Sequence, residues 1–378
     1  MKLSSFLLPA TTAILLSAIV FSCSKSGSNS GTTPGGGDGK DSVLPNIGNN
    51  IILPAYQTLA STTNSLDSAI TDFNTSPDNT KFTAVQTLFK TAYLSWQSVS
   101  EYDYFGPAST GQPVLAGLNL FPTSSTTIET NITAGNNNVN AFANAAAKGF
   151  PALDYLLFGP NSTMAAFSTD ASAANRKAYL SAVSADIKTE SAAALRGWQT
   201  SGGNYITTFI NGAGNSVSSS LGLLINSLVQ DFEIGKNDRL GIPLGKQPPG
   251  QVLPVLPNEV EAYYSGISVQ LALAQLKAVQ NIYLGAGAQG DGHGLEDYLV
   301  KAAAKYNGGL LADTIRVGFS SAVTGLQAIP DPFSVTIQNN AAPAIAVYTQ
   351  YQKLVVLLKT DMPSSLGVLI TFGDNDGD

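Results

Sequence analysis

The sequence has very little of what most metal and redox sites are built from. Its 378 residues include one cysteine, Cys23, and one histidine, His293. A zinc site with two histidines one helical turn apart is therefore excluded within a single chain, as is a structural zinc site of Cys and His ligands. A cysteine–histidine protease centre would need Cys23 inside the folded domain, and Cys23 lies too close to the N-terminus for that. Any metal bound by one chain must be held mainly by carboxylate and carbonyl oxygens.

Charge is also scarce. Asp, Glu, Lys and Arg make up 12% of the residues, against about a quarter in ordinary domains. The net charge of −7 argues against nucleic acid as the main partner. Hydrophobic residues reach 44%, which is enough for a sizeable core, and the length allows two ordinary domains or one large one. Strand-like alternation of apolar and polar residues is scarce throughout, so we predict an all-α protein.

The N-terminus has the pattern of a targeting segment. A short basic region is followed by an apolar run over Phe6–Phe21, and Ser22 directly precedes the only cysteine. This pattern predicts a secretory signal peptide over 1–22, with Cys23 lipidated as the first mature residue and a flexible Ser/Gly-rich tether over 23–49. The protein would then reach the membrane through its lipid anchor in the cell envelope. The alternative is an ordinary cleaved signal with a chance cysteine.

Apolar residues recur at steps of three and four in several segments, which is the spacing of one helix face. We expect an N-terminal helical bundle over about 50–200 and a C-terminal one over 201–378. The predicted helices cover about 51–73, 82–99 with a start signal at Asp78, 139–147, 171–198, 217–232, 269–283, 310–329 and 342–358.

Two apolar stretches in the two halves echo each other. Residues 149–159 are almost wholly apolar apart from one aspartate, and residues 292–300 repeat part of their pattern at a constant offset. A constant offset close to half the mature chain suggests an internal duplication. The matched pairs are Gly149 with Gly292, Asp154 with Asp297, Tyr155 with Tyr298 and Leu156 with Leu299.

The first stretch resembles the G-x-H-x-x-E segment of the imelysin (insulin-cleaving metallopeptidase) family. Gly149 stands at the family's glycine, Pro151 at its histidine and Asp154 at its glutamate. The resemblance is to the imelysin-like branch that departs from the peptidase motif. It implies two helical bundles related by a pseudo-twofold, and a role in periplasmic iron uptake rather than proteolysis. Trp96–Pro107, Lys236–Ser265 and Gly292–Leu299 also resemble imelysin-like sequences.

The resemblance implies Asp154 and Asp297 as paired polar groups in one central crevice, with Tyr155 and Tyr298 beside them. Independently of it, a carboxylate on an apolar helix is costly unless it is paired or binds a cation. Asp154 could therefore cap a neighbouring helix or pair with an arginine, or it could line a cleft and bind a ligand. The sequence leaves both interpretations open.

Two further groups of charged residues have a functional and a structural interpretation. On a helix, His293, Glu296 and Asp297 would share a face and could hold a divalent cation or iron, but they could equally form a surface helix start. Lys236 and Arg239 could neutralise an acidic cleft, or they could be solvated charges of a loop.

The leading functional hypothesis is a lipid-anchored, imelysin-like cell-envelope protein on the outer membrane, facing the periplasm. It would bind a ligand, such as iron or an iron-uptake partner, where the two bundles meet. An alternative is a carboxylate-dependent metallopeptidase in which acidic side chains hold the metal and activate water. A third hypothesis is an interaction protein with no small ligand.

Overall fold

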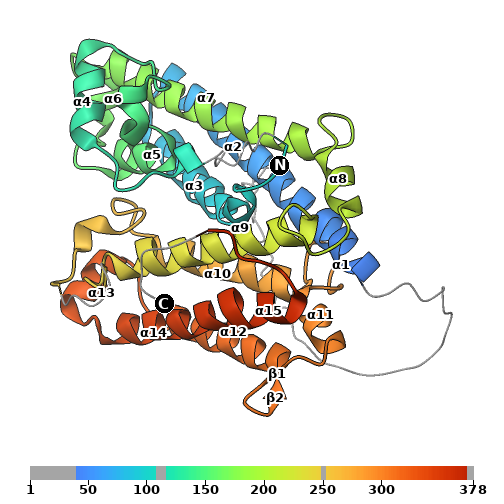
Figure 1. Ribbon diagram of the computed structural model, residues 1–378. Coiled ribbons are helices and arrows are strands. Elements are labelled where there is room, and N and C mark those ends of the chain that lie inside the picture. Colours follow the sequence, from blue (N-terminus) through green and yellow to red (C-terminus); the bar gives the residue numbers. More distant parts are fainter. Residues whose placement is uncertain (1–39, 108–115, 248–252, 373–378) are drawn as a thin grey trace, which may run out of the picture. The chain divides into compact units, whose positions relative to one another are not determined.

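The computed structural model describes residues 40–107, 116–247 and 253–372. In these residues nearly all regular structure is helical, and the two strands, β1 (Lys305–Tyr306) and β2 (Gly309–Leu310), form one short antiparallel hairpin (Figure 1). The all-α prediction is confirmed. The predicted signal peptide and lipidation site lie outside the described residues.

The first set of helices is organised around α2, which packs along both α3 and α7. Helix α5 packs against α7 and α3 from the other side. Most of the predicted helices in this half are confirmed within a few residues. The observed bounds are α2 Leu53–Thr75, α3 Asn79–Trp96, α4 Ser125–Ala134, α5 Gly149–Phe158, α6 Met164–Ser168, α7 Ala173–Trp198 and α8 Tyr205–Asn211.

The second set is organised around α12, which packs against α10 and α14 (orange to red in Figure 1). Helix α9 lies beside the first set and contacts the short helix that follows α3. The observed bounds are α9 Ser220–Ile234, α10 Ser268–Leu284, α11 Leu295–Lys301, α12 Leu311–Gln327, α13 Phe333–Asn339, α14 Ala342–Val356 and α15 Met362–Leu366.

Shorter helical turns connect these elements. The 3₁₀ turns are η2 Ser100–Tyr102, η3 Ala116–Leu118, η4 Phe142–Ala147 and η6 Pro257–Glu259. Three π-helical segments also occur, at η1 Ile47–Ile52, η5 Gly235–Gly241 and η7 Leu357–Asp361.

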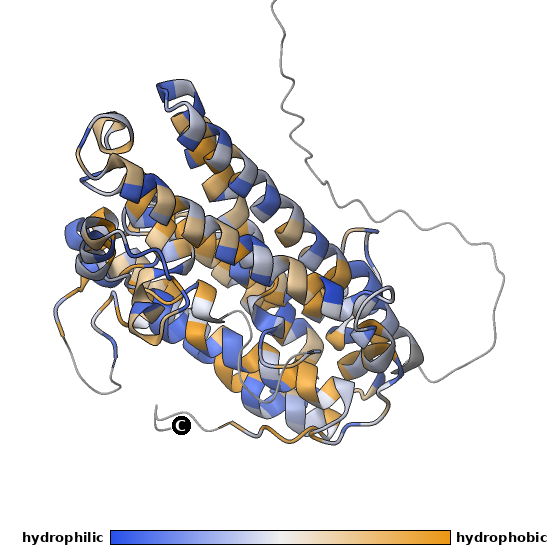
Figure 2. Cartoon of the chain, turned by 90° about the horizontal axis from the view of Figure 1, so that it is seen from above, coloured by the Kyte–Doolittle hydropathy of each residue, from blue (hydrophilic) through white to orange (hydrophobic). Residues whose placement is uncertain are grey.

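Local signals in the sequence account for several boundaries. Asp78 caps α3, because its carboxylate accepts a hydrogen bond of 2.9 Å from the backbone N–H of Lys81. Gly285 ends α10 with a φ of +79°, a conformation that favours glycine. Around the helices, apolar and polar residues alternate as expected for elements with one buried face (Figure 2).

The predicted tether is wrong at its C-terminal end. Residues Lys40–Asn46 form α1, and η1 follows it directly. Val43, Leu44 and Ile47 are buried there, because their side chains join the main hydrophobic cluster. Residues 40–49, which the sequence analysis assigned to the tether, are therefore part of the helical structure.

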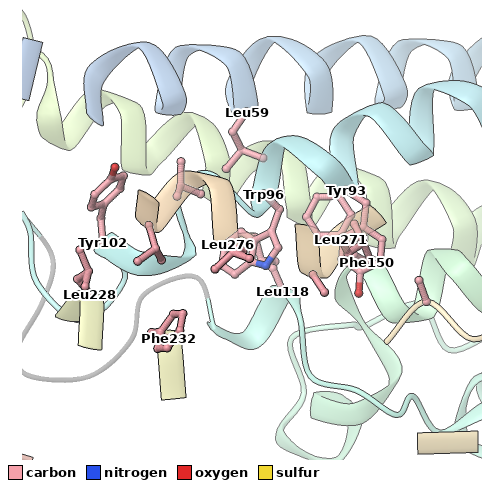
Figure 3. Close-up of a cluster of buried hydrophobic side chains, with 14 of the residues drawn as sticks. Leu59, Tyr93, Trp96, Tyr102, Leu118, Phe150, Leu228, Phe232, Leu271 and Leu276 are labelled. Atoms are coloured by element: carbon pink, nitrogen blue, oxygen red, sulfur yellow. The ribbon is translucent and has the colours of Figure 1, made fainter. Parts of the chain in front are cut away.

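The two sets share one core. Leu59, Tyr93 and Trp96 from the first set lie beside Leu271 and Leu276 of α10 in the same buried cluster (Figure 3). The described residues, 40–107, 116–247 and 253–372, form a single compact unit by their contacts. The two halves are thus two packed layers of one unit, and the surface between them is a place where residues far apart in sequence meet. None of the helices in the described ranges is long and apolar enough to cross a membrane.

Candidate functional site

Helix α5 carries the motif positions and is almost wholly buried. Gly149 has a φ of +75°, and a Cβ there would collide with the backbone carbonyl of Leu118. Only glycine permits this close approach of two backbones. Pro151 is buried in the first turn of α5, where its missing N–H costs no hydrogen bond.

Asp154 binds a turn of the second half and lines a cleft, while its role in binding a ligand stays a prediction. Its side chain lies in the buried α5, and the residue is 2% exposed. Its two carboxylate oxygens accept hydrogen bonds of 2.8 and 2.9 Å from the backbone N–H groups of Tyr264 and Ser265. Burial raises the pKa of Asp154 to about 6, although these hydrogen bonds favour the charged form. The first half of the chain thereby holds a turn of the second half in place.

Asp154 also lines a cleft of about 310 Å³ between α5 and this turn. One wall comes from the first half and the other from the segment after η6. Its lining combines apolar and aromatic residues with several oxygen-bearing side chains, as small-ligand sites do. Residues that line the cleft include Phe121, Thr123, Pro151, Asp154, Glu259 and Tyr263.

A buried ion pair involves Glu261, whose sequence neighbours Val260 and Ala262 line the cleft. Arg239 donates from Nε to Glu261 Oε2 at 2.7 Å, and the residues are 5% and 1% exposed. The adjacent Glu261 carboxylate raises the pKa of Arg239. The alternative that Lys236 and Arg239 are solvated loop charges is wrong, because η5 buries both of them between the two halves.

Side chains from the first half add hydrogen bonds to this pair. Gln97 accepts from Arg239 Nη2 at 2.7 Å and donates to Glu261 Oε1 at 3.0 Å. Asn119 donates to the same Glu261 oxygen at 2.9 Å and accepts from the Tyr93 hydroxyl at 2.6 Å. Sequence reasoning missed Gln97, Asn119 and Glu261, although Glu261 lies inside a segment that resembles the imelysin pattern. Isolated polar residues in turns and loops give no signal of burial.

Tyr155 stands beside the cleft rather than inside it. Its hydroxyl donates to Glu129 at 2.7 Å, and its ring packs edge-on against Tyr264 with centroids 5.2 Å apart. Glu129 also pairs with Arg176 at 2.6 Å. Tyr155 therefore supports the turn that Asp154 holds.

The second echo stretch forms the start of α11. Asp297 accepts from the backbone N–H of Gly294 at 2.8 Å, as an N-terminal cap does, and its carboxylate lies 3.7 Å from His293 Nδ1. Glu296 forms an ion pair with Arg316, with 2.7 Å between Oε2 and Nη2. Across the described part of the chain, no three Asp, Glu, His or Cys side chains converge in the way that a metal ion requires. This arrangement is the surface helix start that the sequence offered as an alternative.

The predicted pairing of the two aspartates finds no support in their contacts. Asp154 bonds to the turn at 264–265, whereas Asp297 bonds within its own helix start, so the carboxylates share no partner. Gly292 packs against Asn46 of α1, and Tyr298 is buried in α11. The sequence echo therefore places matching residues in different local structures.

The family model that matches this chain is that of Imelysin, over residues 52–360. The chain belongs to the imelysin family. Two solved structures share its fold. A putative iron-regulated protein A precursor from Parabacteroides distasonis has a TM-score of 0.70 and 16% identity, covering 89% of this chain and 97% of the other. An imelysin-like protein from Psychrobacter arcticum has a TM-score of 0.66 and 20% identity, covering 88% and 97%. No curated protein sequence matches significantly.

Within this imelysin-family chain, the motif segment and the 257–265 segment come from different halves and meet at one cleft. The histidine position of the motif is occupied by Pro151, which lines that cleft without offering a ligand atom in its side chain. The acidic position is occupied by Asp154, whose oxygens already accept two backbone N–H groups. The cleft thus offers oxygen donors and no imidazole.

Proposed function

We propose that this chain is a lipid-anchored cell-envelope protein that binds iron, as an ion or a small complex, in the cleft beside Asp154, and that it is not a peptidase. The cleft between the two halves carries the proposal. It is the place where the family's motif positions face a second segment of imelysin-like sequence. The related fold of a protein named as iron-regulated supports iron as the first ligand to test.

The oxygen donors around the cleft fit a hard cation better than a soft one. Glu259 supplies a carboxylate, Thr123 a hydroxyl and Asn258 an amide oxygen, while no sulfur or imidazole is present in the lining. Oxygen ligands of this kind prefer hard cations. An iron complex with its own organic ligands would also find aromatic contacts on Phe121 and Tyr263. The lining offers no imidazole as a general base, and Asp154 is held by two backbone N–H groups, so binding is favoured over hydrolysis.

The first test is calorimetry with ferric citrate on the purified mature protein. We expect Glu259→Gln to weaken binding by about tenfold, because it removes a cleft charge that can contact the ligand. Asp154→Ala should abolish binding, because the turn at Tyr264 and Ser265 then loses both of its carboxylate contacts.

A matched control separates binding from simple loss of stability. Asp331 also accepts two consecutive backbone N–H groups, from Val269 at 2.8 Å and Gln270 at 3.2 Å, but it does not line the cleft. Asp331→Ala should cost similar stability and leave ferric citrate binding unchanged. If Glu259→Gln and Asp154→Ala both bind as the parent does, the cleft is not the iron site.

The lipid anchor has its own test. We expect the mature protein to begin at Cys23 and to carry diacylglycerol and an acyl chain, because Ser22 and the apolar run before it form a lipobox. Intact-mass spectrometry of membrane-extracted protein measures this directly, and Cys23→Ser should release the protein from the membrane fraction. An unmodified N-terminus at another residue would contradict the anchor.

A further inference from the structure

A second cavity is lined by residues of both halves, and Phe121 borders both this cavity and the cleft. Its volume is about 190 Å³, which is enough for a small organic molecule and not only for water. Residues of α3, η5 and the C-terminal part of α9 line it. Those on which the argument depends are Trp96, Tyr104, Phe121, Asp231, Asp238 and Arg239.

The charge in the wall of this cavity is unbalanced. Arg239 is already neutralised by its ion pair with Glu261. Asp231 is 2% exposed and accepts a hydrogen bond of 2.6 Å from the Gln275 amide. Among the described residues, neither Asp231 nor Asp238 forms an ion pair. Burial raises the pKa of both carboxyl groups, and Arg239, already paired with Glu261, offsets this only in part.

Two buried donors in the same wall also lack a partner. The indole Nε1 of Trp96 and the Nη1 of Arg239 make no hydrogen bond, although the residues are 3% and 5% exposed. Native proteins rarely leave buried donors unpaired, since an unpaired donor costs about 1–3 kcal/mol. Such donors from both halves therefore point to an oxygen acceptor that the chain itself does not supply.

Three aromatic side chains form part of the remaining lining. The rings of Trp96, Tyr104 and Phe121 border the cavity. Aromatic faces next to carboxylates are suited to an ammonium group and to a small apolar side chain. A metal ion is a poorer fit, because no three acidic side chains converge within the described ranges.

We propose that this cavity binds a small free amino acid. Asp231 and Asp238 would receive its ammonium group, the Trp96 and Arg239 N–H groups would receive its carboxylate, and the aromatic rings would enclose a short apolar side chain. Such a ligand supplies the missing cation and the missing acceptor together. This site is separate from the iron cleft, and neither proposal depends on the other.

The test uses L-valine and two analogues that each lack one charged group. Isobutylamine has no carboxylate and 3-methylbutanoate has no ammonium group. We expect calorimetry on the purified mature protein to give binding of L-valine, and affinities for each analogue that are weaker by about tenfold or more, because each loses a charged contact. Equal binding of isobutylamine, equal binding of 3-methylbutanoate, or no binding of L-valine would each overturn the proposal.

Variants place the ligand in the cavity. Asp231→Asn keeps the shape and an acceptor for Gln275 but removes the charge, and Trp96→Phe keeps an aromatic ring but removes the N–H. Both should weaken L-valine binding by about tenfold. Asp313→Asn, on the exposed face of α12, should bind as the parent does. Unchanged binding in both cavity variants would overturn the proposal, and if one variant fails to fold the other decides.

Discussion

Replacing Glu261 with alanine is expected to lower the free energy of unfolding by about 3–5 kcal/mol. The substitution leaves the Arg239 guanidinium buried without its counterion, 5% exposed. It also removes the acceptor of hydrogen bonds from Gln97 and Asn119. Because these groups come from both halves, the loss should loosen the surface between them. Chemical denaturation followed by circular dichroism measures the change.

Two controls test the physical cause. Asp313 makes an exposed ion pair with Arg316 at 2.8 Å, and Asp313→Ala should change stability by less than about 0.5 kcal/mol. The double variant Arg239→Met with Glu261→Leu should cost less than Glu261→Ala alone, because no buried charge is left unpaired. A loss below about 1 kcal/mol in Glu261→Ala would show that water or a shifted side chain compensates Arg239.

Replacing Gly149 with alanine is expected to lower the free energy of unfolding by about 3 kcal/mol or more. The residue has a φ of +75°, and the new Cβ would collide with the backbone carbonyl of Leu118. The Leu118 backbone cannot move aside as easily as the end of a flexible side chain could. The collision should push the η3 segment outward and carry Asn119 away from Glu261. We therefore expect a lower melting temperature in thermal denaturation and weaker binding of ferric citrate.

Gly308 separates the two causes of this effect. Its φ is +85°, but a Cβ there would meet no atom within 4 Å. Gly308→Ala should thus cost only the strain of the left-handed conformation, about 1 kcal/mol. If Gly149→Ala costs no more than Gly308→Ala, the close approach to Leu118 is not a constraint on the fold, and the motif glycine would need another explanation.

The sequence by itself determined the helices and the family. Apolar residues at steps of three and four located α2, α3 and α12, because one buried face requires that spacing. Asp78 and Gly285 marked helix ends, since a capping carboxylate and a left-handed glycine act through neighbouring residues alone. The motif positions in α5 led to the imelysin family, which the match over residues 52–360 confirms.

Only the tertiary structure decided which polar residues meet. Arg239 and Glu261 are 22 residues apart, and Gln97 joins them from the other half of the chain. Such pairing depends on how two layers of helices pack, and no local pattern encodes it. The echo between Asp154 and Asp297 shows the converse, because similar sequence produced a buried clamp in one half and an exposed helix cap in the other. Local pattern fixes a helix and its faces, whereas long-range packing decides what each face meets.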